Sequence, residues 1–440
     1  MRLQAPKGTY DVLPLDQPRW HHLFDTTRRV LGRAGYQELT TPILEHAEVF
    51  EKAVGDAADL VVQKEMYTFE DRGGRHLTLR PELTAGVLRA FIERGMHTWP
   101  SPVKLWSAGP AFRAENVQRG RYRQFHQVNL EIVGSDSALA DAEAIALMGD
   151  LLAALGLRRT VLKVGSVGDP DDRARYNAYL TQALAPHAEA LSPTSRERLR
   201  LNPMRVLDSK DAGDQELVAT LERPLDFLGE GARAHFGAVT GHLDDWGVEY
   251  EIDPAIVRGL DYYRRTAFEV HHQGIGAQSA LGGGGRYDGL VRQLGGPDVP
   301  GIGWAMGVER LFDALEAEGV TATDRDRPLA FLVAMDEAAV SELAALARAL
   351  RAEFRVEHAY VRRNPTKGLR DADRSGAIYA VLRGERERDA GVVMVKHLER
   401  GDQVEIPLEA LADHLRAAAR DEPQPSTSLH DAGVRTADRG

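Results

Sequence analysis

The segment over residues 112–123 holds residue types that could bind a phosphate group. Arg113 and Glu115 lie two residues apart, so on a strand both side chains point to the same face. The loop that follows contains three more arginines, Arg119, Arg121 and Arg123. A guanidinium suits phosphate oxygens because its planar fork donates paired hydrogen bonds. A charged loop in solvent explains the same residues equally well, so other segments must decide.

The next segment, residues 123–133, alternates in polarity and predicts a strand. Its polar face carries Gln127, Asn129 and Glu131, whereas positions 128, 130 and 132 are apolar. An antiparallel sheet with one face in water produces this alternation, and the pattern alone favours that interpretation. Because the arginine-rich loop lies directly upstream, the polar face could instead line a binding site.

A third candidate lies at residues 302–312, where a strand punctuated by Gly303 and Gly307 runs into a helix. The buried face of that helix carries positions 308, 311, 312 and 315, and Arg310 lies in its first turn, away from that face. A first-turn arginine is unfavourable beside the positive helix end unless an anion joins it. A glycine-rich strand also lets a flat ligand approach the backbone. A surface arginine screened by water is the alternative.

Other kinds of site are excluded or unsupported. The chain contains no cysteine, which excludes disulfides, thiolate metal sites and a cysteine nucleophile. The four glycines at 282–285 lack the spacing of a dinucleotide-binding loop, so we predict a turn there and a helix from Arg286. His126 and His271 lack metal-ligand spacing, and we predict hydrogen-bonded histidines and no protein metal site.

The composition is that of a globular enzyme. The 440 residues suggest about three domains, with 43% hydrophobic and 28% charged residues. A net charge of −11 argues against nucleic-acid binding over the whole surface but allows a local basic face. The start has no apolar stretch of signal-peptide length, and no run is long enough to span a membrane. We therefore expect a cytoplasmic protein without membrane contact.

The first third predicts strands paired antiparallel with helices on one side. Its elements are a helix over 19–34, an extended segment over 36–44 that contains Pro42 near its end, a hairpin at 66–69 and 76–80, and strands over 103–108 and 123–133. Helical patterns then alternate with proline-containing turns over about 168–248, which indicates an inserted helical subdomain. Extended segments are predicted again at 262–271 and 277–281.

A charged linker at 324–328 opens a separate unit in which strands alternate with helices. Its strands are predicted over 329–334, 356–361, 377–382 and 392–395, with a helix near 368–374. The predicted organisation is an α+β catalytic domain in two parts (1–167 and 251–323), a helical insertion (168–250), an α/β domain (328–420) and a disordered tail (421–440). We expect the catalytic domain to hold a mixed, mainly antiparallel sheet flanked by helices.

Together these segments resemble the class II aminoacyl-tRNA synthetases, whose three short motifs occur in order at 35–45, 112–115 and 307–310. Longer stretches resemble the histidyl-tRNA synthetase family specifically. They are Leu-Arg-Pro-Glu-Leu-Thr at 79–84, Gly-Arg-Tyr-Arg-Gln-Phe-His-Gln at 120–127, Val-Arg-Gly-Leu-Asp-Tyr-Tyr at 257–263 and Gly-Gly-Arg-Tyr-Asp-Gly-Leu at 284–290. The resemblance runs from about Lys7 to about Ala419 and implies the class II synthetase fold.

The resemblance also implies where ATP binds. Arg113 would hold the α-phosphate and Glu115 the adenine edge. Arg121 and Arg310 would engage the outer phosphates, with Arg310 also against the adenine. Mg²⁺ would accompany ATP. Arg258 would act beside Arg113 as the family's distinctive electrostatic catalyst.

For histidine, the resemblance implies a second set of residues. Glu82, Thr84 and Gln127 would bind the ammonium and carboxylate groups. Glu131 and Tyr263 would hydrogen-bond the imidazole. The walls of that pocket would be Tyr262 and Tyr287. The implied partners are histidine tRNA and a second copy of the chain, which would dimerise through residues 35–45.

The implied activity is histidine–tRNA ligation through a histidyl-adenylate. In this reaction the carboxylate of histidine is the nucleophile, so the enzyme must align the reactants and stabilise phosphate charge. The basic row over 362–370 suits RNA phosphates within the implied anticodon-binding domain. At Asn116 and Val117 the chain departs from the family's usual Arg-Pro, in a loop that faces the tRNA acceptor end.

The alternative function is a non-catalytic relative, the histidine-sensing regulatory subunit of ATP phosphoribosyltransferase. Loss of the arginine at position 258, or of the C-terminal unit, would favour that regulator. Both are present here, so the enzyme is preferred. A plain nucleotide-binding module would leave the histidine-specific stretches unexplained.

Overall fold

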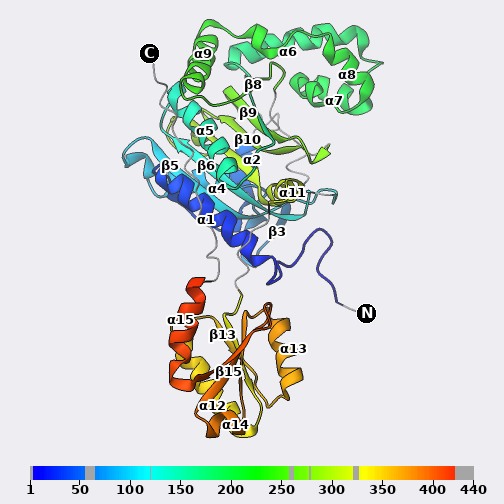
Figure 1. Cartoon of the computed structure of the whole chain (residues 1–440). Coiled ribbons are helices and arrows are strands. Elements are labelled where there is room, and N and C mark those ends of the chain that lie inside the picture. The colour runs from blue at the N-terminus through cyan, green and yellow to red at the C-terminus, as the bar shows by residue number, and fades with distance from the viewer. Residues whose placement is uncertain are drawn as a thin grey trace, which may run out of the picture. The chain divides into compact units, whose positions relative to one another are not determined.

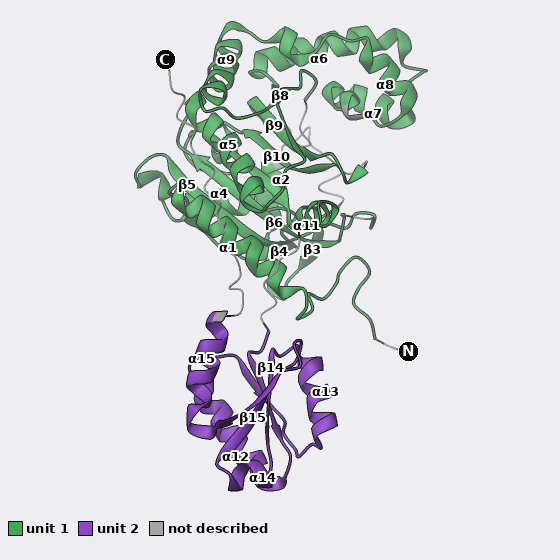
Figure 2. Ribbon diagram, viewed as in Figure 1, with its two compact units in different colours: residues 1–321 green, residues 322–440 purple. Residues whose placement is uncertain are grey.

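The computed structural model describes residues 3–54, 65–118, 120–256, 262–276, 279–320 and 327–421. The chain divides into two compact units, residues 1–321 and 322–440 (Figure 2). The predicted tail lies outside the described residues except for its first position. No helix in the described ranges is both long and apolar enough to cross a membrane.

The first unit is built on a mixed, mainly antiparallel sheet of eight strands, as predicted. In spatial order they are β1 (Gln37–Glu38), β5 (Val103–Phe112), β6 (Gln124–Val133), β11 (Gly301–Gly307), β10 (Ala280–Arg286), β9 (Arg264–His272), β7 (Thr160–Ser166) and β8 (Glu251–Ile252). The two outermost pairs, β1–β5 and β7–β8, are parallel, and every other pair is antiparallel. The short strand β1 is an edge of the sheet, and Pro42, which follows it, lies outside the strand and costs no ladder hydrogen bond.

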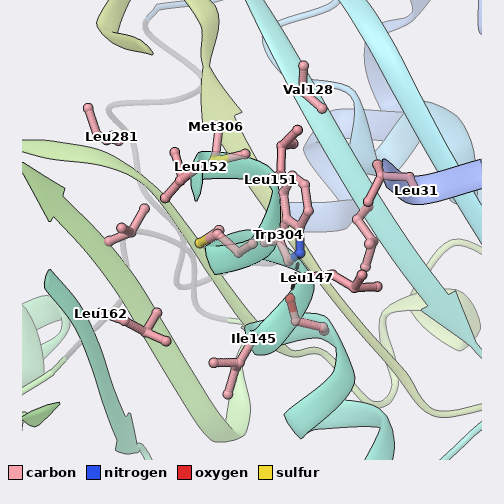
Figure 3. Close-up of a cluster of buried hydrophobic side chains, with 14 of the residues drawn as sticks. Leu31, Val128, Ile145, Leu147, Leu151, Leu152, Leu162, Leu281, Trp304 and Met306 are labelled. Atoms are coloured by element: carbon pink, nitrogen blue, oxygen red, sulfur yellow. Dashed lines mark hydrogen bonds between the residues drawn. The ribbon is translucent and has the colours of Figure 1, made fainter. Parts of the chain in front are cut away.

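Helices flank both faces of this sheet (Figure 1), as expected for the catalytic domain, but the helices of the first third do not all lie on one side as predicted. One face is covered by α1 (Gln17–Arg33), α5 (Ala138–Ala154), α9 (Glu230–Asp245) and α11 (Val308–Ala317). The other face is covered by α2 (Ala47–Val54) and α4 (Thr84–Glu93). The main core gathers around Trp304, whose indole Nε1 donates to the Ala144 carbonyl at 2.8 Å (Figure 3). As a result β6 is buried on both faces from Gln127 to Val133, and the interpretation with one face in water is wrong.

A second, three-stranded sheet carries the predicted hairpin. Strands β3 (Tyr67–Glu70) and β4 (His76–Leu79) pair antiparallel, and β2 (Leu44–His46) pairs with the other edge of β4. A short 3₁₀ helix, η1 (Met96–Thr98), follows α4. Because β4 leads directly into α4, this sheet places residues 80–84 at the N-terminus of that helix.

The glycine run at 282–285 forms the middle of β10, so the predicted turn is wrong. A Cβ on Gly284 would lie 2.0 Å from the Gly303 carbonyl oxygen, and one on Gly282 would lie 2.4 Å from the Ala305 carbonyl oxygen. Glycine is needed there because β10 and β11 approach too closely for side chains. The predicted helix from Arg286 is also shorter than expected, since α10 spans only Leu290–Gln293.

The segment between β7 and β8 is helical. Its elements before α9 are α6 (Pro170–Leu184), η2 (Ala185–His187), α7 (Pro193–Leu201), η3 (Pro203–Asp208), α8 (Ala212–Ala219) and η4 (Pro224–Phe227). They share a hydrophobic cluster of their own, which also takes in Ile256, Tyr263 and Ala267. In contrast, Val239 and Leu243 of α9 belong to the main core. The domain boundaries at 168 and 250 remain a prediction.

The second unit is an α/β domain with its own five-stranded sheet. The strands, in spatial order, are β13 (Val356–His358), β12 (Ala330–Ala334), β14 (Tyr379–Arg383), β15 (Val392–His397) and β16 (Gln403–Pro407). Its helices are α12 (Glu337–Leu350), α13 (Pro365–Ser375), α14 (Glu385–Asp389), η6 (Leu408–Ala410) and α15 (Leu411–Asp421). The sequence analysis missed β16, a short edge strand that is almost entirely exposed and of which only Ile406 is partly buried.

Candidate active site

A single cavity of about 420 Å³ in the first unit collects the predicted site residues. Every one of them that the structure describes lines this cavity: Glu82, Thr84, Arg113, Glu115, Arg121, Gln127, Glu131, Tyr262, Tyr263, Tyr287 and Arg310. They come from segments as far apart in sequence as α4 and α11. Arg258 lies outside the described residues. The structure therefore brings the described candidates together, while the role of each remains a prediction.

One end of the cavity is centred on the buried carboxylate of Glu131. Its Oε1 accepts a hydrogen bond from Thr84 Oγ1 at 2.7 Å, and its Oε2 accepts one from the Tyr287 hydroxyl at 2.7 Å. Asn129 Nδ2 donates to the same Thr84 hydroxyl at 3.0 Å. Burial raises the pKa of Glu131 to about 8, although the Tyr287 and Thr84 hydroxyls oppose that shift.

Aromatic rings form the wall beside Glu131. The Tyr262 and Tyr263 ring centroids lie 4.7 Å apart, and Tyr262 meets Tyr287 edge to face at 6.2 Å. Burial raises the pKa of Tyr262 and of Tyr287 well above the ordinary value, so both phenols stay neutral and can donate hydrogen bonds. We call this end of the cavity the aromatic slot, because tilted tyrosine rings line it beside a buried carboxyl group.

Glycines in β10 and β11 make room for the side chains of this slot. A Cβ on Gly303 would lie 2.0 Å from Glu131 Oε2, one on Gly301 would lie 2.3 Å from the Tyr287 ring, and one on Gly285 would lie 2.8 Å from the Tyr263 ring. Gly303, which the sequence analysis linked to a flat ligand, is therefore needed to make room for the protein's own Glu131 side chain.

We expect Gly303→Ala to lower the free energy of unfolding by about 1–3 kcal/mol, because the added methyl overpacks a closed site. It should also weaken histidine binding by displacing the Glu131 carboxylate. Gly307→Ala is the matched control for unfolding, since a Cβ there meets its nearest neighbour, Arg310 Cδ, at 3.8 Å. Calorimetric unfolding of both variants tests this, and equal destabilisation would contradict it.

Glu82 occupies the N-terminus of α4. Its carboxylate accepts hydrogen bonds from the backbone N–H groups of Thr84 and, at 2.7 Å, Ala85. Burial raises the pKa of Glu82, and the N–H groups and the charge of Arg113 oppose that shift. Close by on β6, Gln127 is buried, and its Oε1 has no hydrogen-bond partner among the described residues. A buried acceptor of this kind suits a ligand that brings N–H donors.

The other end of the cavity is cationic. Arg113 donates from Nε to the Pro81 carbonyl at 2.9 Å and lies over the Phe125 ring, 5.2 Å from its centroid. Arg310 donates to the Ala280 carbonyl at 2.6 Å and to the Gly120 carbonyl at 3.3 Å. Burial and the nearby charge of Arg121 lower the pKa of Arg310, and the carboxylates of Glu115 and Asp313 oppose that shift.

Three described carboxylates act on these guanidinium groups. Glu115 lies 3.4 Å from Arg121, the charges of Glu82 and Arg113 interact, and Asp313 adds negative charge near Arg310. Arginines held this close together repel one another, and an anion between them removes that repulsion. The arrangement therefore favours a polyphosphate beside these arginines, in the same cavity as the tyrosines.

Sequence reasoning missed a cluster that supports the phosphate end. Glu309, which lines the cavity, accepts hydrogen bonds from the Tyr10 hydroxyl at 2.6 Å and from the His126 backbone N–H at 3.0 Å. His126 Nδ1 also lies 3.0 Å from Glu309, so the prediction of an ordinary hydrogen-bonded histidine is confirmed. Tyr10 packs on Tyr122 with ring centroids 5.1 Å apart. No spacing pattern points to Tyr10, which lies 299 residues from its partner.

Comparisons with known proteins agree with this geometry. A family model described as histidyl-tRNA synthetase matches residues 8–311, and an anticodon-binding-domain model matches residues 329–418. The chain is 56% identical to the histidine–tRNA ligase of Thermus thermophilus over 420 residues, which is 95% of this chain and all of that protein. It is 52% identical to the histidine–tRNA ligase of Deinococcus radiodurans, covering 94% and 100% of the two chains.

A solved structure gives the same result. The apo histidyl-tRNA synthetase of Staphylococcus aureus superposes with a TM-score of 0.80 at 34% identity, covering 94% of this chain and 100% of that one. The matches span both units of the present chain and nearly the whole length of each relative. The chain belongs to the histidyl-tRNA synthetase family.

Proposed function

We propose that this histidine–tRNA ligase activates histidine in the cavity described above, by reaction with ATP. The observation that carries the proposal is the division of one cavity into an aromatic slot with a buried carboxyl group and an end lined by three arginines. An imidazole fits the first end and a triphosphate fits the second. The resulting histidyl-adenylate then supplies histidine to the 3′ end of the tRNA.

The chemistry needs no nucleophile from the protein. A carboxylate oxygen of histidine bonds to the α-phosphorus of ATP while the bond from that phosphorus to the bridging oxygen of pyrophosphate breaks. Negative charge is concentrated on the non-bridging oxygens during this step. Arg113 and Arg258 are the candidates to stabilise it, and Arg121 and Arg310 would hold the departing pyrophosphate.

Selection of histidine would depend on hydrogen bonds that other amino acids cannot make. Glu131 and Tyr263 would bind the two ring nitrogens, with Tyr262 and Tyr287 against the ring faces. Glu82, Thr84 and the Gln127 amide would bind the ammonium and carboxylate groups. An amino acid without the ring nitrogens leaves buried polar groups unsatisfied, which can reject it by several orders of magnitude.

Mg²⁺ would accompany the phosphates of ATP. It is a hard cation that uses few protein oxygens and several phosphate or water oxygens. The ion would neutralise phosphate charge, while the arginines orient the chain of phosphates.

The second unit would bind the tRNA. Its basic row, which includes Arg362, Arg363 and Lys367, leads into the N-terminus of α13. Nearby, Tyr360 is 83% exposed, as a base-stacking side chain must be. We further propose a cytoplasmic homodimer joined through residues 35–45, as the resemblance implies.

The regulatory alternative is not favoured. The ligases that match this chain are covered along 100% of their length. A Bacillus halodurans structure described as an ATP phosphoribosyltransferase regulatory subunit/histidyl-tRNA synthetase is only 23% identical and shows the fold alone. The deciding experiment is exchange of labelled pyrophosphate into ATP. We expect exchange that requires histidine, and exchange no higher than without histidine would overturn the enzymatic proposal.

Histidine binding should depend on pH through Glu131. The pKa of this carboxyl group is about 8 in the empty cavity, so it is mostly protonated at pH 7. A ring N–H binds the ionised form better, and binding must therefore release a proton. We expect the dissociation constant to fall about fivefold from pH 7 to pH 8. Calorimetric titration checks this, and Glu131→Gln should abolish the dependence.

A further inference from the structure

The first unit contains a second cavity, of about 470 Å³, outside the active-site cavity. Three arginines line it, namely Arg173 from the first turn of α6, Arg264 from the start of β9 and Arg292 from α10. The cavity lies where the helical segment after β7 meets the main sheet. Such a concentration of positive charge contrasts with the net charge of −11 for the chain.

Asp288, a carboxylate that lines this cavity, hydrogen-bonds to groups other than the three arginines. Asp288 Oδ1 accepts hydrogen bonds from Arg286 Nη1 at 3.0 Å and from the Gly301 N–H at 3.1 Å. Arg292 pairs with Asp298 at 2.9 Å, but both side chains are more than half exposed, so this pair holds the guanidinium weakly. Among the described residues that line the cavity, Asp288 is the one carboxylate beside three arginines.

Of the three arginines, Arg264 gives the strongest evidence for a bound ligand. It is half-buried, yet the described part of the chain offers it no ion pair or hydrogen bond. Its neighbour Arg265, in contrast, forms a two-pronged pair with Asp169 at 2.9 and 3.3 Å. Beside Arg264, Gly289 adopts a left-handed backbone with φ of +94°, and a Cβ there would lie 3.4 Å from the guanidinium. The backbone thus leaves the Arg264 fork open toward the cavity.

We propose that this second cavity binds a phosphate group through Arg264, with Arg173 and Arg292 beside it. A phosphate has the charge and the paired oxygens that a guanidinium fork recognises. The site adjoins the proposed histidine pocket because Tyr262 lines both cavities and Arg173 donates to the Tyr263 carbonyl at 3.1 Å. The group could belong to free pyrophosphate or to the backbone of bound tRNA.

The first arm of the test uses pyrophosphate as the probe. The full-length protein is saturated with ATP in the absence of histidine, so that the active-site cavity is filled and no adenylate forms. Calorimetric titration should then detect pyrophosphate binding to the wild type and a loss of about tenfold or more in affinity for Arg264→Gln. Arg28→Gln, which removes an exposed arginine of α1 outside both cavities, should bind as the wild type does.

The second arm measures tRNA charging by the same variants. If the phosphate belongs to tRNA, Arg264→Gln should raise KM for tRNA about tenfold and reduce the salt dependence of tRNA binding, with histidine-dependent exchange unchanged. If Arg264→Gln loses pyrophosphate binding but keeps the wild-type KM for tRNA, the ligand is a free anion. If Arg264→Gln binds pyrophosphate and charges tRNA as well as Arg28→Gln does, the proposal is overturned. This holds whether or not the exchange assay supports the ligase function.

Discussion

Replacing Arg258 with histidine should lower histidine-dependent pyrophosphate exchange by a factor of about 10²–10³, the usual effect of removing one preorganised donor to a developing oxyanion. The dissociation constant of histidine should change by less than about threefold, because a residue that acts on the transition state contributes little to ground-state affinity. Exchange kinetics and calorimetric titration measure the two quantities. The prediction rests on the family resemblance, since this residue lies outside the described ranges.

Arg258→Lys is the matched control. Lysine retains the positive charge but not the planar fork, so it should recover part of the lost rate. If Arg258→His weakens histidine binding as strongly as it slows exchange, the residue serves substrate binding and its catalytic assignment is wrong.

The second large effect concerns Glu131. We expect Glu131→Gln to lower kcat/KM for histidine about 10³-fold, because the amide no longer offers two anionic oxygens to the imidazole and to the hydroxyls of Thr84 and Tyr287. Steady-state exchange with histidine as the varied substrate measures this loss.

Tyr287→Phe is the control for this second prediction. It removes only the 2.7 Å hydrogen bond to Glu131 and keeps the aromatic wall, so a loss of about tenfold is expected. If Glu131→Gln lowers kcat/KM for histidine no more than Tyr287→Phe does, the carboxylate does not bind the imidazole ring. In both variants KM for ATP should stay near that of the wild type, because the arginines at the other end of the cavity are untouched.

Much of the fold could be predicted from local patterns. The helix that ends before Gly35, the hairpin at 67–79 and the strand over 124–133 follow from polarity periods and turn residues, which act between residues close in sequence. Local patterns singled out the segments at 112–123, 123–133 and 302–312, and the family resemblance supplied the other candidates and the role of each. The described candidates do line one cavity.

The errors share a physical cause. The period of two along β6 shows which side chains share a face, but whether the polar face meets water depends on which helices pack there. The glycines at 282–285 favour a turn locally, yet the distance from β10 to β11 decides that they form a strand. Neither piece of information is present in a short window of sequence.

The residue types, their alternation along each element and the motifs that mark the family are all properties of the sequence. Which of those residues meet depends on the tertiary structure. Glu131 contacts Thr84 across 47 positions and Tyr287 across 156, and Tyr10 reaches Glu309 across 299. Contacts at such separations depend on how strands pair and helices pack, because side-chain hydrogen bonds and charge act over a few ångströms in space, whatever the distance along the chain.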